Sequence, residues 1–200
     1  MRLLVIGFIS LIILGCSGKQ ALKGETPWQK KMNADFKDAS KSPLKDKDRK
    51  NFVELDFFKF DSAYVVKSIL KRTPDSDWFD MKTTTDRVSK ERVYGIIEFE
   101  LKGETYQLNV YQESPDEEGA IPDYLFLPFL DDTNGAGSYA AGRYIDLKIP
   151  KGDSIEVDFN KAFNPYCAYN EKYSCPIVPR ENYVATRIEA GVKAFKKSDK

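Results

Sequence analysis

The chain has 200 residues, of which 31% are charged and 13% are aromatic, and it contains no histidine. The missing histidine excludes Ser-His-Asp and Cys-His catalysis, zinc sites that use histidine, and a histidine pH switch. Basic and acidic residues balance at 31 each, so nothing in the charge favours nucleic acid as a partner. The length suits a single domain with a substantial core.

The N-terminus resembles a bacterial lipoprotein signal. Arg2 precedes a largely apolar run, Leu3–Leu14, that is too short to span a bilayer. The run ends in the letters ILGC, the order of a lipobox, so residues 1–15 are expected to be cleaved and Cys16 to carry acyl chains such as palmitate. Several acyl chains on one residue give stable anchoring. The alternative is an ordinary signal peptide with a chance cysteine.

The expected location is the cell envelope, with the N-terminal lipid as the attachment to a membrane. Residues 16–26 are mostly small and polar and predict a tether, so residues 27–200 form the single domain. No acidic residue follows Cys16 directly, which by analogy with bacterial sorting rules favours the outer membrane in a cell that has one. Removal of the signal takes away Arg2 and leaves a net charge of −1.

A helix is predicted first, from residue 27 to about residue 39. Thr26 is a good N-cap and Pro27 suits the first helical position. Three apolar residues share one face of this helix: Trp28, Met32 and Phe36. The charged stretch 41–50, which contains a proline, predicts a surface turn or a short helix.

Strand patterns dominate from residue 52 onward. Residues 52–60 form a short apolar stretch, and residues 63–72 alternate loosely between apolar and polar. Residues 93–110 alternate on both sides of Lys102-Gly103, which predicts a β-hairpin. Residues 123–130 predict a buried strand that contains a proline.

A second hairpin is predicted from residues 142–150 and 154–160, with Gly152 in its turn. The C-terminal stretch 181–195 fits a strand or a helix equally well. The count is about eight strands and one N-terminal helix, without βαβ alternation. The predicted fold class is therefore mainly β, an antiparallel β-sandwich or barrel of about eight strands with an N-terminal helix.

Three segments resemble the domain-of-unknown-function family 1684 of bacteria and archaea. They read YLFLPFLDDTNGAGSYAAGRYIDL, VDFNKAFNPYCAYNEKYSCPIVPREN and IEAGVKAF. They carry the family pattern F-x-D-x-T-x-G, G-R-Y, D-F-N, N-P-x-C-x-Y, C-P and P-x-x-N, and the resemblance covers about residues 28–196. Ser138 and Val192 depart from the threonine and glutamate usual at their positions. The resemblance implies a shared fold and supplies no known activity.

The polar and aromatic residues of these motifs are the candidate binding or catalytic residues. They are Asp131, Thr133, Tyr139, Arg143, Asp158, Asn160, Asn164, Tyr169 and Asn182. We predict a lipid-anchored domain that binds a small molecule or an envelope protein through the loops 131–144 and 160–182. The alternative is a hydrolase or metal-assisted enzyme that uses Asp131, Asp158 and Arg143. We expect no cofactor and no bound metal.

Cys167 and Cys175 are the only thiols left once Cys16 is acylated. Outside the cytoplasm such a pair predicts a disulfide, which would stabilise the fold by about 2–3 kcal/mol on the chain-entropy model. The alternative is two buried free cysteines. Their wide spacing and the lack of histidine argue against zinc.

Two motifs also have a purely structural interpretation. Asp131, Asp132, Asp158 and Glu181 have the oxygen ligands that calcium prefers, but the sequence DDTNGAG favours an Asx-type turn with glycines at positive φ. The guanidinium of Arg143 suits either a bound carboxylate or phosphate, or an ion pair with Asp131 or Asp158. The three candidate asparagines suit hydrogen bonds to loop backbone.

Overall fold

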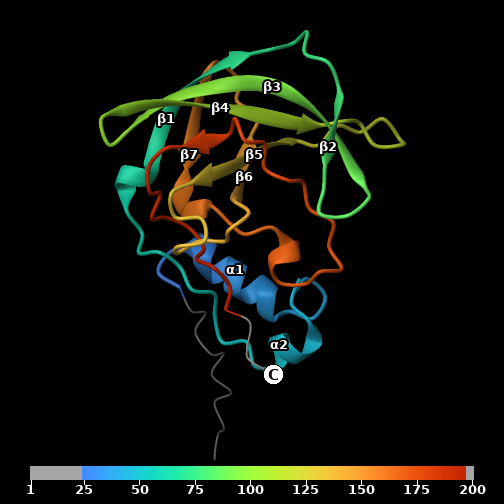
Figure 1. Ribbon diagram of the computed structural model, residues 1–200, viewed down its shortest axis with the longest axis vertical. Helices are drawn as coiled ribbons and strands as arrows, with labels where there is room; N and C mark the ends of the chain where they lie inside the picture. The colour runs from blue at the N-terminus through green and yellow to red at the C-terminus, as the bar shows by residue number, and fades with distance from the viewer. Residues whose placement is uncertain (1–23, 197–200) are drawn as a thin grey trace, which may run out of the picture.

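The computed structural model describes residues 24–196, in which eight strands form one sheet curled into a half-barrel (Figure 1). The strand order is β6-β5-β4-β3-β1-β7, with β2 paired to β3 and β8 paired to β5. The strands are β1 (Val65–Arg72), β2 (Phe79–Lys82), β3 (Val88–Leu101), β4 (Glu104–Glu113), β5 (Tyr124–Asp131), β6 (Arg143–Lys148), β7 (Ser154–Asp158) and β8 (Tyr183–Val184). The predicted signal, Cys16 and most of the tether lie outside the described residues.

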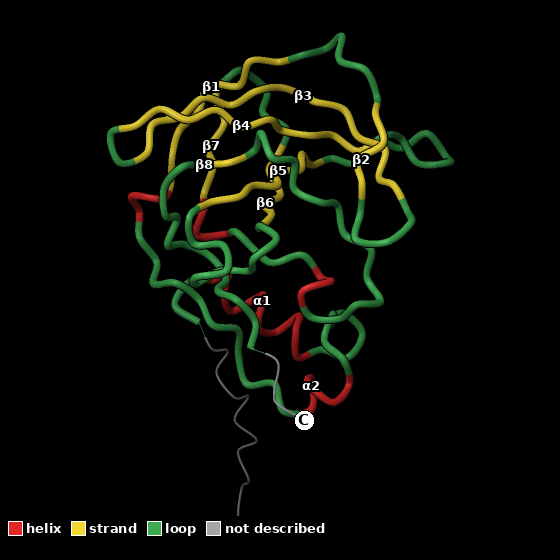
Figure 2. Tube along the Cα trace, viewed as in Figure 1, coloured by secondary structure: helices red, strands yellow, loops and turns green. Residues whose placement is uncertain are grey.

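Two helices lie together at the end of the molecule away from β3 and β4 (Figure 1). They are α1 (Pro27–Lys37) and α2 (Asp46–Lys50), and three short 3-10 helices cover Ser62–Tyr64, Phe159–Lys161 and Tyr166–Ala168. Most of the chain between the sheet and these helices is irregular (Figure 2). No helix in the stretch 24–196 has the length and apolar character needed to cross a membrane.

The helix α1 begins where the capping residues Thr26 and Pro27 predicted, so this prediction is confirmed. The Thr26 hydroxyl accepts a hydrogen bond from the Gln29 N–H, and the Gln29 side chain accepts one from the Thr26 N–H. This capping box satisfies amide groups that have no partner within the helix. The apolar face then packs on the loops, and the Phe36 ring meets the Tyr169 ring edge-on with 4.8 Å between the centroids.

The predicted hairpin is confirmed as β3 and β4, joined at Lys102-Gly103. Both turn residues have positive φ, 54° and 83°, as this tight turn requires. A β-bulge interrupts the pairing, so that Val93 lies opposite Tyr111 and Gly95 lies opposite Val110. The extra residue reverses which side chains of β3 face the core. Glu91 therefore lies on the outer face of the sheet.

The second predicted hairpin is wrong. The strand β6 pairs with β5, whereas β7 pairs with β1 at the opposite edge of the sheet. The residues between them cross from one edge of the curled sheet to the other instead of closing a two-strand ladder. Alternation and a turn glycine predict two strands and a reversal correctly, but they do not specify the pairing partners.

One further expectation is corrected near the start of the domain, and one open alternative is resolved in part near its end. Residues 52–60 form no strand, and only Phe57 makes an isolated bridge, with Val192. The C-terminal stretch contains the two-residue strand β8, parallel to β5, and otherwise neither helix nor strand up to residue 196. Both segments are held by packing, by hydrogen bonds to side chains and by backbone hydrogen bonds between them, such as the one from the Phe58 N–H to the Gly191 carbonyl.

The inner face of the half-barrel holds the main core. Leu70, Ile97, Leu125, Val157 and Phe159 are each at most 1% exposed and come from different parts of the sheet and the turn after β7. A second cluster joins α1 to the loops around Tyr169 and Val192. The outer face of β3 to β6 is covered in part by the loop 163–176, and this arrangement creates the pocket described below.

Candidate functional site

Arg143 and Asp131 form a buried ion pair at the junction of β5 and β6. One guanidinium nitrogen of Arg143 lies 3.0 Å from Asp131 Oδ1, and both side chains have no exposed surface. The same guanidinium donates to the carbonyl oxygens of Ile188 and Ala190. Asp131 accepts hydrogen bonds from the backbone N–H groups of Thr133 and Ile188. This geometry confirms the predicted ion pair with Asp131. The hydrogen bonds from this pair to Ile188 and Ala190 fix the C-terminal segment against β5 and β6.

The turn after β5 is the Asx-type turn expected from the letters DDTNGAG. The Thr133 hydroxyl donates to Asp131 and shares a hydrogen bond with Ser138 at 2.8 Å. Gly135 and Gly137 have φ values of 77° and 155°. In the described stretch 24–196, no three carboxylate or cysteine side chains gather closely enough to hold a metal ion.

Asp158 does not join Asp131 and Arg143. Its carboxylate caps the short helix at Phe159–Lys161 by accepting from the Asn160 N–H, and it pairs with Lys161 at 3.0 Å. The Asn160 amide in turn accepts from the N–H of Asp61 and donates to its carbonyl oxygen. The sequence-predicted trio is therefore split between two places in the fold.

The two remaining candidate asparagines, Asn164 and Asn182, also bind backbone. The Asn182 amide donates to the carbonyl oxygens of Asn109 and Pro128 and accepts from the Asn109 N–H. It thereby joins β4 and β5, which share only one registered pair, Tyr111 with Phe126. Asn164 donates to the carbonyl of Lys193 and to the Tyr169 hydroxyl. The predicted role of the asparagines as backbone partners is confirmed, and a role in ligand binding stays a prediction.

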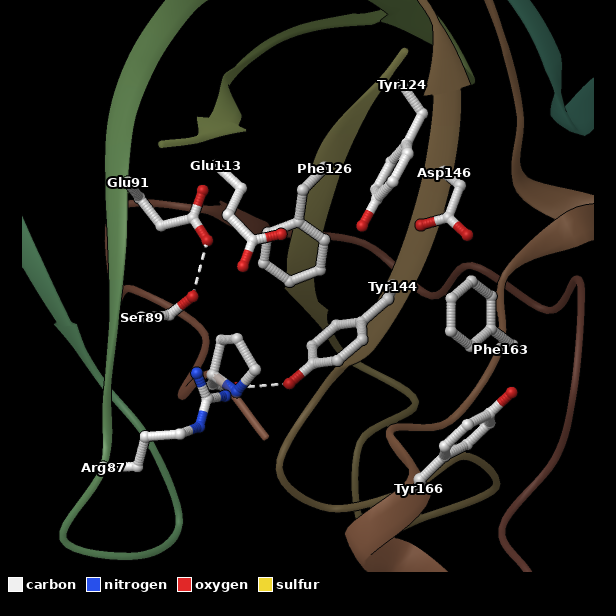
Figure 3. A pocket seen from close by; sticks show the side chains of 11 residues that line it. Arg87, Ser89, Glu91, Glu113, Tyr124, Phe126, Tyr144, Asp146, Phe163 and Tyr166 are labelled. Carbon is white, nitrogen blue, oxygen red and sulfur yellow. Dashed lines mark hydrogen bonds between the residues drawn. The ribbon is translucent and has the colours of Figure 1, made fainter. Parts of the chain in front are cut away.

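A pocket of 310 Å³ opens on the outer face of the sheet (Figure 3). None of the candidate residues lines it, but Tyr144, Phe163, Tyr166 and Pro176 come from the predicted loops 131–144 and 160–182. Its floor consists of side chains from four neighbouring strands, β3 to β6. Its wall is the loop that carries the cysteines. The lining residues are Arg87, Ser89, Glu91, Glu113, Tyr124, Phe126, Tyr144, Asp146, Phe163, Tyr166 and Pro176.

Glu91 is the most deeply buried acid of this pocket, with 3% of its surface exposed. The Ser89 hydroxyl donates to Glu91 Oε1 at 2.8 Å, whereas Glu91 Oε2 is buried and has no hydrogen-bond partner. Burial, together with the nearby charge of Glu113, raises the pKa of Glu91 to about 7. A buried acceptor without a partner costs about 1–3 kcal/mol, so it indicates a place where a ligand donor fits.

The rings of the pocket are fixed by packing. Phe126 and Tyr144 meet edge-on with 4.7 Å between the centroids, and the Tyr144 hydroxyl donates to the Pro176 carbonyl oxygen. Burial raises the pKa of Tyr144, so this hydroxyl stays protonated at neutral pH. The Tyr124 hydroxyl points into the pocket from the rim (Figure 3). The floor is therefore a rigid aromatic surface between acidic groups.

Comparison with known proteins places this fold and its motifs in a family. A family model described as "Protein of unknown function (DUF1684)" matches residues 50–193. The chain belongs to this family. It is also similar to the solution NMR structure of an uncharacterized protein from gene locus rrnAC0354 of Haloarcula marismortui, with a TM-score of 0.65 and 31% identity. That match covers 82% of this chain and 89% of the other. No curated protein matches at a significant level.

The two cysteines of this DUF1684 domain are free thiols in the structure, so the predicted disulfide is not present in it. They lie close together nonetheless, since the Cys167 N–H donates to the Cys175 sulfur at 3.2 Å. The Cys175 thiol, with help from Thr84 and Tyr139, lowers the pKa of Cys167 to about 6. Both cysteines belong to the loop that forms the pocket wall, next to the lining residues Tyr166 and Pro176.

Sequence reasoning missed the pocket of this DUF1684 domain because its acids are far apart in the chain. Glu91, Glu113 and Asp146 come from three strands, and none belongs to a recognisable motif. One signal was present: Gly95 is a glycine inside a strand, and the register shift lies directly before it. A bulge there moves Glu91 from the core side, where alternation alone would place it, to the outer face.

Proposed function

We propose that this protein is a lipid-anchored, extracytoplasmic domain that binds a small molecule in the pocket on the outer face of β3 to β6. The observation that carries the proposal is the buried Glu91 Oε2, which lacks a partner at the edge of a ring-lined cavity. Ligand pockets combine apolar walls with a few placed polar groups, and 310 Å³ lies at the small end of their usual range. A small molecule fits this cavity better than an envelope protein does.

The anchoring part of the proposal rests on the lipobox around Cys16, in the cell envelope and at the outer membrane where the cell has one. Cys16→Ala should abolish incorporation of a labelled palmitate and release the protein from the membrane fraction. Cys167→Ala is the matched control and should keep both. Label incorporated into the Cys16→Ala protein would contradict lipidation at this residue.

An oxidising location also bears on the thiol pair. There, we propose, an envelope disulfide oxidant removes two electrons and two protons from Cys167 and Cys175 and forms the S–S bond. The described structure is then the dithiol form of the loop. Mass analysis under non-reducing conditions should show the loss of two hydrogens in protein from the envelope.

The hydrolase alternative with Asp131, Asp158 and Arg143 has no support in the geometry. Asp131 and Arg143 are fully buried and bind each other and the backbone, and Asp158 lies elsewhere beside Lys161. Catalytic groups must reach a substrate, and a substrate has no access to this pair.

The binding proposal is tested on the purified lipoprotein in detergent. A library of cationic, neutral and anionic metabolites is screened for compounds that raise the Tm. The variant Phe126→Trp is screened in parallel, because its larger side chain fills part of the pocket. At least one compound should stabilise the unmodified protein and stabilise Phe126→Trp clearly less. Compounds that stabilise both proteins equally, or no stabilising compound at all, would contradict the proposal.

A further inference from the structure

The charged groups of the pocket are mostly acidic. Carboxylates come from three strands: Glu91 on β3, Glu113 on β4 and Asp146 on β6. The single cationic lining residue, Arg87, already donates to the carbonyl oxygen and the hydroxyl of Ser174 at 3.1 and 3.2 Å. The pocket thus has more acidic than basic side chains, and its one basic side chain, Arg87, is hydrogen-bonded to the loop 163–176.

Lys148 is paired with Tyr124 in the ladder between β5 and β6, but it is not among the residues that line the pocket. Among the described residues, no ion pair joins Lys148 to Glu113 or to Asp146. A cationic ligand would therefore meet carboxylates that are not already neutralised by the protein.

Aromatic rings separate the acidic groups. Phe126 is paired with Tyr111 on one side and with Asp146 on the other, and Tyr124 follows on the same face of β5. The faces of such rings attract cations within about 6 Å of the ring centre. The strands β4 and β6 are two strand spacings apart, about 10 Å. The pocket therefore presents an acid, an aromatic floor and a second acid in a row (Figure 3).

The free oxygen of Glu91 requires a donor. An ammonium group has three N–H donors and no acceptor, so it can serve Glu91 Oε2 and Glu113 together. A hydroxyl would supply a single donor and no charge, and an anion would be repelled by the surrounding carboxylates. Charge-assisted hydrogen bonds are also the stronger kind.

We propose that the pocket binds a small organic cation, an aliphatic amine with an ammonium group on Glu91 and Glu113, its apolar body on Tyr124 and Phe126, and a second ammonium group at Asp146. This inference rests on the proposed function, because it names the ligand class of the same pocket. Asp146 is exposed to solvent, unlike Glu91. It therefore acts at the rim, and Glu91 is the principal anchor.

Binding of an amine should depend on pH through Glu91. The groups that face it are Arg87 and Ser89 on its own segment, Glu113 and Tyr111 on β4, Tyr124 on β5, and Tyr144 and Asp146 on β6. Burial raises the pKa of the three tyrosines, so they stay neutral between pH 6 and 8. Glu91, with a pKa of about 7, ionises in this interval, so affinity should rise about tenfold from pH 6 to pH 8.

The test is isothermal titration of the full lipoprotein in detergent with three ligands of one length: cadaverine, the matching diol and glutarate. Cadaverine should bind, and the other two should bind at least tenfold more weakly. Glu91→Gln should weaken cadaverine binding at least tenfold and remove its pH dependence, and Asp146→Asn should weaken it less. The control Glu100→Gln, exposed on the same strand, should bind as the unmodified protein does.

The outcomes separate the two proposals. Failure of cadaverine to bind, or equal binding by Glu91→Gln, would overturn the amine inference. If the diol or glutarate binds better and Phe126→Trp weakens that binding, the pocket is still a ligand site of another class. If the metabolite screen also yields no pocket ligand, the proposed function fails as well. A melting curve of each variant, recorded in the same detergent, establishes that it is folded.

Discussion

Replacing Glu91 by glutamine is expected to stabilise the protein at pH 8 and to change it much less at pH 5. The native state holds the Glu91 carboxyl in a buried site that raises its pKa from 4.5 to about 7. The folded protein therefore binds a proton more tightly than the unfolded chain does. Stability from this proton is present below pH 4.5 and is lost as the pH rises to about 7.

The magnitude follows from the two pKa values. Their difference corresponds to about 3 kcal/mol of unfolding free energy at pH 8, since one pKa unit is about 1.4 kcal/mol. Water that enters the pocket screens part of this penalty, so we expect a gain of about 2 kcal/mol for Glu91→Gln at pH 8. At pH 5 most of the penalty is absent, and the gain should fall below about 1 kcal/mol. The hydrogen bond from Ser89 survives, because glutamine Oε1 also accepts it.

Urea unfolding at pH 5 and pH 8, followed by circular dichroism, measures both values. Glu100→Gln is the matched control, because Glu100 is exposed on the same strand, and it should change stability by less than about 0.5 kcal/mol at either pH. A gain for Glu91→Gln that is the same at both pH values would refute the raised pKa. A loss at pH 8 would show that the ionised carboxylate is already well satisfied.

Three further outcomes are expected. Asn182→Ala should lower the unfolding free energy by about 3 kcal/mol, because three hydrogen bonds to backbone disappear, and a loss below about 1 kcal/mol in urea unfolding would speak against this bridging role. Gly142→Ala should cost more than about 2 kcal/mol, since its φ is 95° and a Cβ would lie 2.6 Å from Val178, whereas Gly152→Ala meets nothing within 4 Å and should be nearly neutral. In the dithiol form, iodoacetamide at pH 7 should label Cys167 before Cys175, because the pKa of Cys167 is about 6 and that of Cys175 is raised. Mass spectrometry of tryptic peptides measures the two labelling rates, and equal rates would contradict this order.

The sequence predicted correctly those elements that depend on residues close together in the chain, such as helix caps and tight turns. The helix α1 follows from Thr26, Pro27 and one apolar face, and the β3–β4 hairpin follows from alternation around Lys102-Gly103. The strands with which β6 and β7 pair could not be predicted in this way. Their alternation fits a hairpin, but the curled sheet offers each strand a longer partner elsewhere, β5 for β6 and β1 for β7.

The site was harder to predict for a physical reason. Polar residues in the family motifs, such as Asp131 and Asn182, suggested a ligand site. A mainly irregular C-terminal segment, however, needs buried polar side chains to satisfy its own backbone. The acidic residues of the pocket lie within strands and match none of the family motif positions. Glu91 reaches the outer face only because of the bulge before Gly95, and the three-dimensional pairing brings Asp146 to the same face.

A crystal structure of the protein with cadaverine would show directly whether the pocket is an amine site. We expect a ligand nitrogen at a hydrogen-bond distance of about 2.7–3.2 Å from Glu91 Oε2, with the carbon chain on Phe126. We also expect the Asp131–Arg143 pair to be unchanged. A ligand bound elsewhere, or an empty pocket at saturating cadaverine with Glu91 Oε2 still lacking a partner, would contradict the amine site.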